Sequence, residues 1–435
     1  MTGPERAGSF GRFVTDARLA GELVVQPRMG MADPQRMRSG LAATRAAAAT
    51  TVGTITLDSY TRVADWPAAA EALRTGAPLN GYPIVTHELA TTRAVLAGIA
   101  DDAAFPVQVR HGSAQPEAIF EALVAAGLSA TEGGPVSYCL PYGRVPLHAA
   151  VDSWKRCCAI LAAVADTGVQ PHLETFGGCL MGQLCPPSLL VAVAVLEALF
   201  FAQHGLTSVS LSYAQQASHA QDVEAVRALH RLAGELLPGL DTHVVIYAYM
   251  GVYPRTVLGA ERLLVRAARL AAGTGAARLI VKTAAEAHRI PTVAENVRAL
   301  ELASVTARAT GPEPFTDGGT EVCGEIQSEV YGEARALIEA VLELDDDLGR
   351  ALLKAFRSGY LDVPFCLHPD NAGRSRSRLA PDGRLSWSRV GSMPLPPPRS
   401  RPEPRELTAA ELLRCLSHVE RTCDEASLEE SLAAV

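Results

Sequence analysis

The chain has 435 residues, of which 48% are hydrophobic and 20% are charged, so it is long and apolar enough to bury a large core. Its formal net charge of −8 and isoelectric point near 5.8 argue against nucleic acid as a partner, because binding to a polyanion depends on clustered lysine and arginine. The N-terminus has no apolar run of signal-peptide length, and the most apolar stretch, residues 186–205, contains Glu197. We therefore expect a cytoplasmic protein with no membrane contact, in which residues 186–205 form a buried helix.

Short β-rich runs alternate along the chain with segments rich in alanine, leucine and arginine. Nine runs show this pattern: residues 22–28, 52–58, 82–87, 105–111, 135–141, 169–174, 208–213, 243–250 and 277–283. The alternation predicts a parallel sheet, and the nearly continuous apolar character of the runs predicts strands covered on both faces. The number of runs favours an α/β fold of the (β/α)8 TIM-barrel type, in which one run is not a strand. A doubly wound sheet is the alternative, although neither GxGxxG nor GxxxxGK[ST] occurs where that fold would use it.

The composition changes after Lys282, where helical segments lead into an irregular stretch and then a proline-rich stretch at residues 392–406. We expect an N-terminal arm (1–20), a TIM-barrel catalytic domain (21–360) and a C-terminal extension (361–435) with a proline-rich linker and a terminal helix. The nine cysteines include no CxxC pair and no zinc-like spacing, which predicts free, buried thiols and no metal site.

Arginines follow several predicted strands, at the end where a TIM barrel has its active site. Arg28 ends the first run, Arg62 follows the second, and Arg110 ends the fourth together with His111. A guanidinium group binds a carboxylate through two parallel hydrogen bonds, so three arginines at one mouth predict a substrate with two carboxylates. A single arginine at a strand end is more often part of a surface salt bridge, and the coincidence of three is what favours a binding site.

Three further polar residues flank the fifth run, namely Glu132, Tyr138 and Tyr142. A carboxylate at Glu132 could hold the ammonium group of an amino acid or move a proton. The two tyrosine hydroxyls could hold a substrate oxygen, although tyrosines of this kind are also ordinary core residues with a hydrated hydroxyl.

Longer segments around these residues resemble a known family. The segments are VVQPRMG, LDSYTR, LNGYP, VRHG, TEGGPVSYCLPY, YMGVYP, LIVKTAAEAHRIPT and DVPFCLHPDNAG, and in this order they resemble the epsilon (catalytic) subunit of glutamate mutase, also called methylaspartate mutase. The resemblance implies a TIM barrel that binds the substrate and shares adenosylcobalamin (coenzyme B12) with a small, separate cobalamin-binding subunit of the sigma type. It also implies a reversible rearrangement of L-glutamate to L-threo-3-methylaspartate by radical fragmentation and recombination, in a hetero-oligomer built on an epsilon homodimer.

The resemblance assigns a role to each matching residue. The substrate carboxylates would be bound by Arg28, Arg62 and Arg110, with His111 beside the last. Glu132 would be the base at the substrate amino group, and Tyr138 and Tyr142 would contact the substrate. The matching cofactor positions are Gly30, Asn80, Pro141, Tyr253, Lys282, Glu286 and Ile290.

Two of these cofactor positions also have a simpler interpretation. By resemblance, Lys282 and Glu286 approach the adenosyl ribose, whereas their spacing alone is typical of an ordinary i,i+4 ion pair on a helix. Tyr253 stands where the clostridial enzymes have phenylalanine.

The cobalt-binding loop of these enzymes reads DxHxxG, and the nearest match here is Asp241-Thr-His243, which lacks the glycine. We therefore expect the chain to need a small flavodoxin-like partner and to be inactive alone. The chain also departs from the family at Glu88 and Leu173, where glycine and arginine are usual, so a close analogue of glutamate is an open alternative as substrate.

Two other functions stay open from the sequence. One is a barrel lyase acting on a dicarboxylate, either without a cofactor or with a metal held by strand-end groups such as Asp58, His172 and Glu174. The other is a non-catalytic subunit that uses the pocket for binding only.

Overall fold

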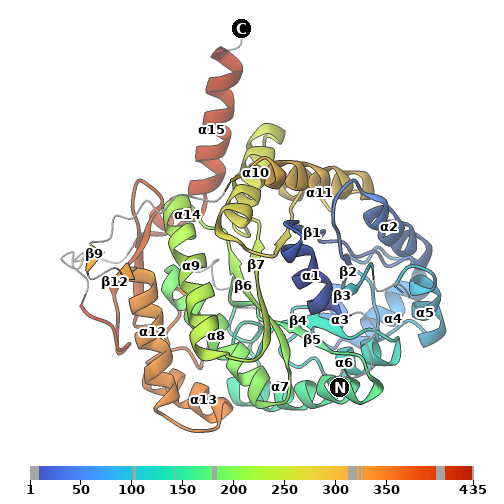
Figure 1. Cartoon of the computed structure of the whole chain (residues 1–435), viewed down its shortest axis with the longest axis horizontal. Coiled ribbons are helices and arrows are strands. Elements are labelled where there is room, and N and C mark those ends of the chain that lie inside the picture. The colour runs from blue at the N-terminus through green and yellow to red at the C-terminus, as the bar shows by residue number, and fades with distance from the viewer. Residues whose placement is uncertain are drawn as a thin grey trace.

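The computed structural model describes residues 9–100, 104–141, 143–178, 184–311, 321–322, 325–326, 328–397 and 407–433. At its centre is a parallel sheet whose eight strands lie in the order β1-β8-β7-β6-β5-β4-β3-β2. The strands are β1 (Val24–Gln26), β2 (Gly53–Thr56), β3 (Val107–Arg110), β4 (Ala130–Glu132), β5 (His172–Glu174), β6 (Ser208–Ala214), β7 (Asp241–Tyr247) and β8 (Arg278–Ile280). A parallel bridge between Val25 and Thr51 links β1 to the segment before β2, so the sheet curls into a nearly closed barrel (Figure 1). The predicted TIM-barrel fold is confirmed.

Helices surround the barrel on its outside (Figure 1). They are α2 (Pro34–Ala46), α3 (Ser59–Arg62), α4 (Trp66–Thr75), α5 (Leu89–Leu96), α6 (Glu117–Ala125), α7 (Leu147–Ala162), η1 (Ala163–Thr167), α8 (Pro187–Gln203), α9 (His219–Leu236), α10 (Val257–Thr274), η3 (Ala284–Ala287), α11 (Val293–Arg308), α12 (Glu329–Leu342) and α13 (Leu348–Ser358). Almost every side chain of α8 is buried, because this helix packs against β6 on one side and against α9, α12 and α13 on the others. The buried helix predicted for residues 186–205 is confirmed.

Two of the nine predicted strands are wrong, and one strand of the barrel was not predicted. Residues 82–87 form turns that touch the barrel through a single bridge between Leu57 and Tyr82. Residues 135–141 also form turns, and the fourth strand is the shorter β4 that precedes them. The strand ends there because Gly133 has a φ of +128°, a conformation that glycine adopts without strain. The apolar character of residues 135–141 reflects burial in the core and not strand pairing.

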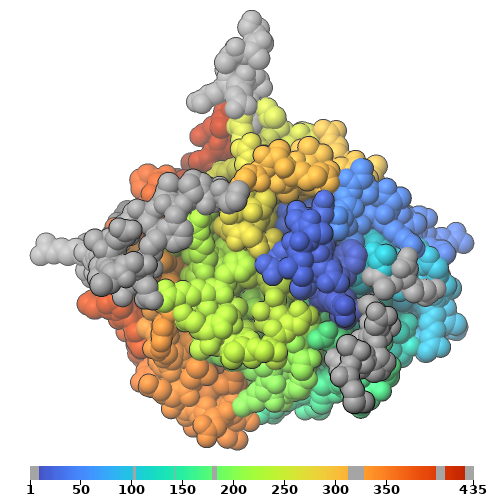
Figure 2. All heavy atoms as spheres, viewed as in Figure 1, coloured from blue at the N-terminus to red at the C-terminus, as the bar shows by residue number. Residues whose placement is uncertain are grey.

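The N-terminal helix α1 (Phe10–Leu19) covers the end of the barrel where the strands begin, as Figures 1 and 2 show. The Phe10 ring stacks on the His172 ring with 5.2 Å between centroids. Gly11 lies so close to Ser208 that a Cβ atom at this position would overlap the serine hydroxyl. A small apolar cluster fixes the helix to the strand starts and consists of Phe10, Val14, Val24, Val52, Ala130 and Ala277. The polar residues that end the strands therefore lie at the opposite end of the barrel.

After the barrel, the chain forms small sheets and two further helices. These elements are β9 (Glu321–Val322) with β10 (Glu325–Ile326), the hairpin β11 (Arg376–Leu379) and β12 (Leu385–Arg389), and the helices α14 (Ala409–Leu416) and α15 (His418–Ala433). Helix α15 projects away from the barrel (Figure 1). Its Asp424 carboxylate holds it to the start of α10, because it accepts hydrogen bonds from the backbone N–H groups of Arg255 and Thr256 at 2.9 and 3.1 Å.

Several predictions about the whole chain have different outcomes. The described cysteines are all free, and all but Cys415 are buried, as expected. Cys179, Cys323 and residues 398–406 of the predicted linker lie outside the described residues. None of the helices in the described ranges combines the length and the apolar character of a membrane span. The division into arm, barrel and extension and the cytoplasmic location stay predictions.

Arg278 forms a buried ion pair inside the barrel. Its side chain is fully buried, pairs with Glu174, and donates to the amide oxygen of Gln26. Its guanidinium carbon also lies 4.9 Å from the centre of the Phe10 ring. Burial alone would raise the pKa of Glu174, but the charges of Arg278 and Arg110 outweigh it and lower that pKa. The ion pair thus contributes stability above the usual glutamate pKa, and this contribution is lost on acidification.

Replacing Arg278 with methionine is expected to lower the free energy of unfolding by about 3–5 kcal/mol, because it leaves the Glu174 charge buried and unpaired. Urea unfolding at pH 7 measures this loss. The double variant Arg278→Met/Glu174→Leu should recover most of it, because an apolar pair of similar volume avoids the cost of burying charge. Equal instability of the single and double variants would show that shape, not charge, dominates at this position.

Candidate functional site

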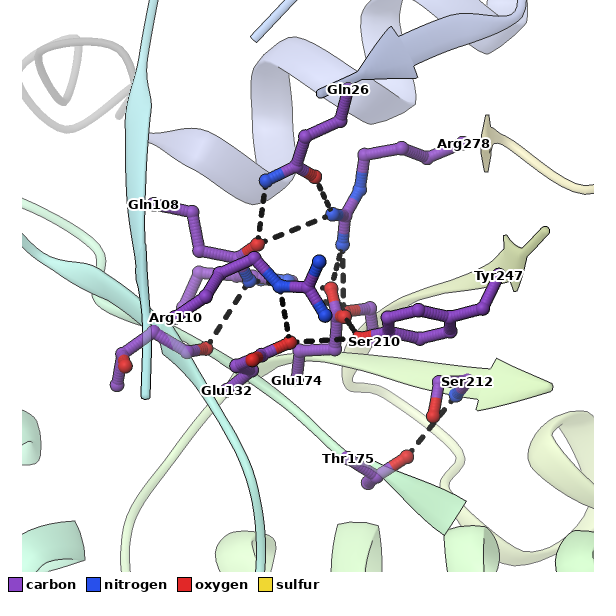
Figure 3. Close-up of polar contacts among 12 residues, drawn as sticks. Gln26, Gln108, Arg110, Glu132, Glu174, Thr175, Ser210, Ser212, Tyr247 and Arg278 are labelled. Atoms are coloured by element: carbon purple, nitrogen blue, oxygen red, sulfur yellow. Dashed lines mark hydrogen bonds and ion pairs between the residues drawn. The ribbon is translucent and has the colours of Figure 1, made fainter. Parts of the chain in front are cut away.

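Glu132, the last residue of β4, is the centre of the candidate site (Figure 3). Its carboxylate accepts a hydrogen bond from Arg110 Nε at 2.7 Å, lies 2.9 Å from the Tyr247 hydroxyl, and accepts a further bond from the Tyr138 hydroxyl. Arg110 ends the neighbouring strand β3, and Tyr247 ends β7. All four side chains are almost completely buried, so the polar contacts between them act in a medium of low dielectric constant.

A second carboxylate lies beside the first. Glu174 is paired with Glu132 in the register of β4 and β5, and the Tyr247 hydroxyl is hydrogen-bonded to both (Figure 3). Burial, and then the charges of the two glutamates, raise the pKa of Tyr247, so its hydroxyl keeps the proton that it donates. Arg110 and Arg278 flank this carboxylate pair on its two sides and balance its charge.

Arg110 has a guanidinium edge that suits a ligand. Burial disfavours its charged form, but the charge of Glu132, together with smaller contributions from Tyr247, Tyr138 and Glu174, outweighs burial and keeps the pKa of Arg110 above its usual value. The guanidinium carbon lies 4.9 Å from the centre of the Tyr247 ring and 5.7 Å from that of Phe176. Among the described residues, Nε bonds to Glu132 and no acceptor bonds to the two terminal nitrogens. These nitrogens can therefore bind a ligand carboxylate.

Arg62 and His111 lie beside this group. Arg62, at the end of α3, donates through Nε and Nη2 to the Leu57 carbonyl at 3.1 and 3.0 Å. Burial, followed by the positive charges of Arg62 and Arg110, lowers the pKa of His111 to about 3, so the ring is neutral at pH 7. His111 Nδ1 accepts from the Ser113 N–H at 3.0 Å, which places the ring proton on Nε2. Within the described ranges this buried Nε2 has no partner, so it can donate to a ligand oxygen.

Arg28 belongs to a second group, where β1 and β8 end side by side. Arg28 Nη1 and Lys282 Nζ each lie 3.4 Å from Glu286 Oε2, so the expected Lys282–Glu286 ion pair is present and includes a third charge. Lys282 Nζ is also 4.5 Å from the centre of the Tyr253 ring, and burial lowers the pKa of Lys282 although Glu286 opposes the shift. In the part of the chain that is described, the buried Tyr253 hydroxyl has no hydrogen-bond partner.

Gly30 and Asn80 have partners within the chain. Gly30 lies against the backbone of Thr56, where a Cβ atom would overlap the carbonyl, so close packing alone requires glycine here. Asn80 is exposed, and its Oδ1 accepts from the backbone N–H of Ser59 at 2.9 Å, at the start of α3. Both residues have a structural role, and their roles as cofactor contacts stay predictions.

The other predicted positions differ in accessibility. Pro141 is partly exposed, and the Ile290 side chain is 61% exposed. Tyr142 lies outside the described residues. Of the three arginines predicted to converge, Arg110 bonds to Glu132 and Arg28 bonds to Glu286, and their convergence on one substrate stays a prediction.

The predicted strand-end metal ligands do not come together. His172 starts β5, and its ring lies between the hydroxyls of Ser208 and Ser210 at 2.9 and 3.0 Å. Asp58 caps α3, and Glu174 pairs with Arg278. No group of three histidine, cysteine, aspartate or glutamate residues in the described ranges is arranged to hold a metal ion.

The sequence did not single out Glu197 for the site, although its charge within an apolar helix was the signal. Its Oε1 accepts hydrogen bonds from the backbone N–H groups of Val136 and Ser137 at 3.0 and 2.9 Å. Gly134 makes room for it, because a Cβ atom there would overlap the carboxylate. Glu197 therefore fixes the turn that carries Tyr138 to Glu132. Burial raises the pKa of Glu197 to about 7, although the backbone donors oppose the shift.

This shift predicts a pH-dependent stability. The native state holds the Glu197 proton up to about pH 7, whereas the unfolded chain releases it near the usual glutamate pKa of 4.5, so stability falls as the pH rises between these values. The variant Glu197→Gln keeps the acceptor and cannot ionise. Between pH 5 and pH 8 the native chain should lose about 2–3 kcal/mol relative to this variant, as measured by urea unfolding. A constant difference across this range would contradict the shift, and Glu197→Leu should be destabilised at both values because two buried N–H groups lose their acceptor.

Comparisons with known proteins add to this geometry. The model of the family described as "Methylaspartate mutase E chain" matches residues 4–408. The glutamate mutase epsilon subunit of Halobacterium salinarum is 33% identical over 348 residues, which are 78% of this chain and 71% of that protein. That of Escherichia coli O157:H7 is 30% identical over 356 residues, which are 78% and 72% of the two chains. A solved structure of a spore coat polysaccharide biosynthesis protein from Bacillus subtilis covers 73% of this chain and 77% of its own, with 10% identity and a TM-score of 0.39, and says nothing about the reaction.

Proposed function

Because the chain belongs to the methylaspartate mutase E chain family, we propose that it is the catalytic subunit of an adenosylcobalamin-dependent mutase that interconverts L-glutamate and L-threo-3-methylaspartate. A mutase role is common to the glutamate mutase relatives. One observation carries the proposal for this particular substrate pair. The buried Glu132 carboxylate is bonded to Arg110, and the terminal nitrogens of that arginine have no acceptor among the described residues.

Each charged group of such a substrate has a counterpart in the chain. In the proposal, one carboxylate binds the terminal nitrogens of Arg110, and the other binds Arg62 and Arg28. His111 Nε2 donates to an oxygen of the same ligand, and Tyr138 and Tyr142 contact it as well. Guanidinium groups on separate elements of the fold support a reaction by fragmentation, because they would keep both pieces in place until they recombine.

Glu132 is the proposed partner of the substrate amino group. Its two carboxylate oxygens already accept from Arg110, Tyr138 and Tyr247, which fixes the orientation of the carboxylate plane. A carboxylate held in this way can accept the ammonium proton without moving. The surrounding burial supports this role because it excludes water that would otherwise exchange protons or quench a reactive species.

The group around Glu286 fits the nucleoside part of the cofactor. The unpartnered Tyr253 hydroxyl, the Lys282 ammonium and the Glu286 carboxylate offer both donors and acceptors for ribose hydroxyls, and the exposed side chain of Ile290 offers apolar contact. When bound, adenosylcobalamin supplies the carbon-centred radical chemistry that amino-acid side chains lack. We propose that Arg28, which bonds to the same Glu286, connects this group to the substrate.

Cobalamin would be shared with a small sigma-type subunit, in a hetero-oligomer built on a homodimer of this chain. The name epsilon subunit describes the relatives as parts of a multi-subunit enzyme. His243, the nearest match to a cobalt ligand, lies within β7 and stacks on His172 with 5.0 Å between ring centroids. It is 5% exposed, which supports the proposal that the cobalt ligand comes from the partner.

Reconstitution tests the proposal. The purified chain, a small cobalamin-binding subunit and adenosylcobalamin together should convert L-glutamate to 3-methylaspartate, and omission of any component should abolish the product. Glutarate, which lacks the amino group, should bind weakly and give no product. Absence of both 3-methylaspartate and cobalamin retention in the mixture would overturn the proposal.

A further inference from the structure

A pocket of about 440 Å³ lies between the hairpin β11–β12 and the helices α14 and α15. None of the residues that line it belongs to the candidate site. Five of them are arginines, and we call this cavity the arginine pocket after Arg376, Arg378, Arg389, Arg414 and Arg421. In a chain with a net charge of −8, five guanidinium groups around one cavity are a strong local excess of positive charge.

In the part of the chain that the structure describes, few groups neutralise this charge. Among the lining residues the structure describes, Glu411 is the carboxylate, and its Oε2 accepts from the backbone N–H and the hydroxyl of Thr408, each at 2.8 Å, to cap α14. The side chains of Arg378, Arg389 and Arg414 form no ion pair or side-chain hydrogen bond with any described residue. All three are exposed. Their charge is therefore available to an anion that enters the pocket.

The hairpin places two arginines directly opposite each other. Arg376 pairs with Arg389 in the antiparallel register, next to a bulge. Like charges opposite each other destabilise a strand pair, and an anion between them removes this cost. Arg376 is already oriented, because its Nη1 donates to the carbonyls of Gly373 and Ser375 at 2.8 and 2.7 Å. The hairpin thus offers two cations, of which Arg376 is held in place by the backbone.

The helices offer a second pair. Arg414 and Arg421 are on opposite sides of the junction between α14 and α15, and Arg421 Nη2 donates to the Arg414 carbonyl at 3.1 Å. The remaining wall is mixed: it includes the apolar residues Leu184, Phe365 and Leu379 as well as Ser377, Ser388, Glu411 and His418. The pocket therefore combines cations on two elements with some apolar surface.

We propose that the arginine pocket binds an organic polyphosphate of nucleotide size. Guanidinium groups bind phosphate oxygens through paired hydrogen bonds, and five of them exceed what a single carboxylate needs. The apolar part of the wall suits the uncharged part of such a ligand. The cavity volume lies within the range of about 300–1,000 Å³ that is usual for small-molecule sites.

Isothermal calorimetry of ATP binding to the full-length purified chain at low ionic strength tests this inference. ATP should bind with a 1:1 stoichiometry, more tightly than inorganic triphosphate or adenosine, and the affinity should fall as salt is added. ATP should also raise the thermal midpoint of the chain. The double variant Arg378→Gln/Arg389→Gln should weaken ATP binding about tenfold or more, because both side chains lose charged donors.

The matched control removes the same two charges elsewhere. Arg269 on α10 and Arg357 on α13 are exposed and do not line the pocket, so Arg269→Gln/Arg357→Gln should bind ATP like the native chain. An equal loss of ATP affinity in this control would mean that only the net charge of the chain matters, and it would overturn the proposal. So would the absence of ATP binding at millimolar concentration, equal affinity for inorganic triphosphate and ATP, or tighter binding of a single-stranded oligonucleotide. Circular dichroism checks that both variants are folded.

Discussion

Replacing Arg110 with lysine is expected to lower turnover of the reconstituted mutase by about 100-fold or more. Arg110 uses Nε for Glu132 and has two terminal nitrogens without an acceptor among the described residues, so one guanidinium group can serve the protein and a ligand together. A lysine ammonium keeps the charge but cannot present this planar fork. The loss should therefore appear in both the catalytic constant and the Michaelis constant for L-glutamate.

The measurement is steady-state formation of 3-methylaspartate with saturating partner subunit and cofactor. Arg269→Lys, on the exposed face of α10, is the matched control and should leave turnover unchanged. Urea unfolding of Arg110→Lys should show a folded chain, because the charge opposite Glu132 is kept. Normal turnover of the variant would remove Arg110 from the substrate site.

Replacing Glu132 with glutamine is expected to lower the catalytic constant by about 100- to 10,000-fold. The amide oxygen can still accept from Tyr138 or Tyr247, but the group can no longer take a proton or oppose the charge of Arg110. The Michaelis constant for L-glutamate should change less than the catalytic constant, since the arginines that bind the carboxylates are unchanged.

The variant Tyr247→Phe distinguishes the contribution of the Glu132 charge to catalysis from the contribution of its orientation. It removes one hydroxyl from the carboxylate and leaves the carboxylate and Arg110 in place, so we expect a loss of about tenfold, smaller than that of Glu132→Gln. Equal losses in the two variants would mean that the hydrogen-bonded arrangement matters and the proton acceptor does not. A large rise in the Michaelis constant of Glu132→Gln, with little change in the catalytic constant, would limit Glu132 to a role in binding.

The barrel could be predicted from the sequence because alternation of strands and helices is a regular, local signal. The fourth strand could not, since β4 has only three residues while the longer apolar run at 135–141 is buried in turns. The pattern of apolar residues indicates burial, and a buried turn gives the same apolar pattern in the sequence as a buried strand. The prediction thus found the right segment of chain and assigned the wrong conformation to it.

The site was predictable where its residues end strands and not where contacts depend on register. Arg110 follows from its position at a strand end, whereas Glu132 was predicted only as a carboxylate that flanks the run at 135–141, and the structure does bring the two together. Tyr247 falls inside a predicted run, and only the pairing of β7 with its neighbours shows that it points to Glu132. The ion pair between Arg28 and Glu286 has the same origin, because it depends on β1 lying next to β8.

The position of α1 has a consequence for the kinetics of the proposed enzyme. This helix occupies one end of the barrel and the Arg278–Glu174 ion pair lies inside the barrel, so in the described structure a substrate has the other end for both entry and exit. In the proposed complex the cobalamin-binding subunit covers that same end. Product release would then require the partner to tilt or dissociate. In that case the residence time of the partner, and not the chemical step, would limit the rate of successive turnovers.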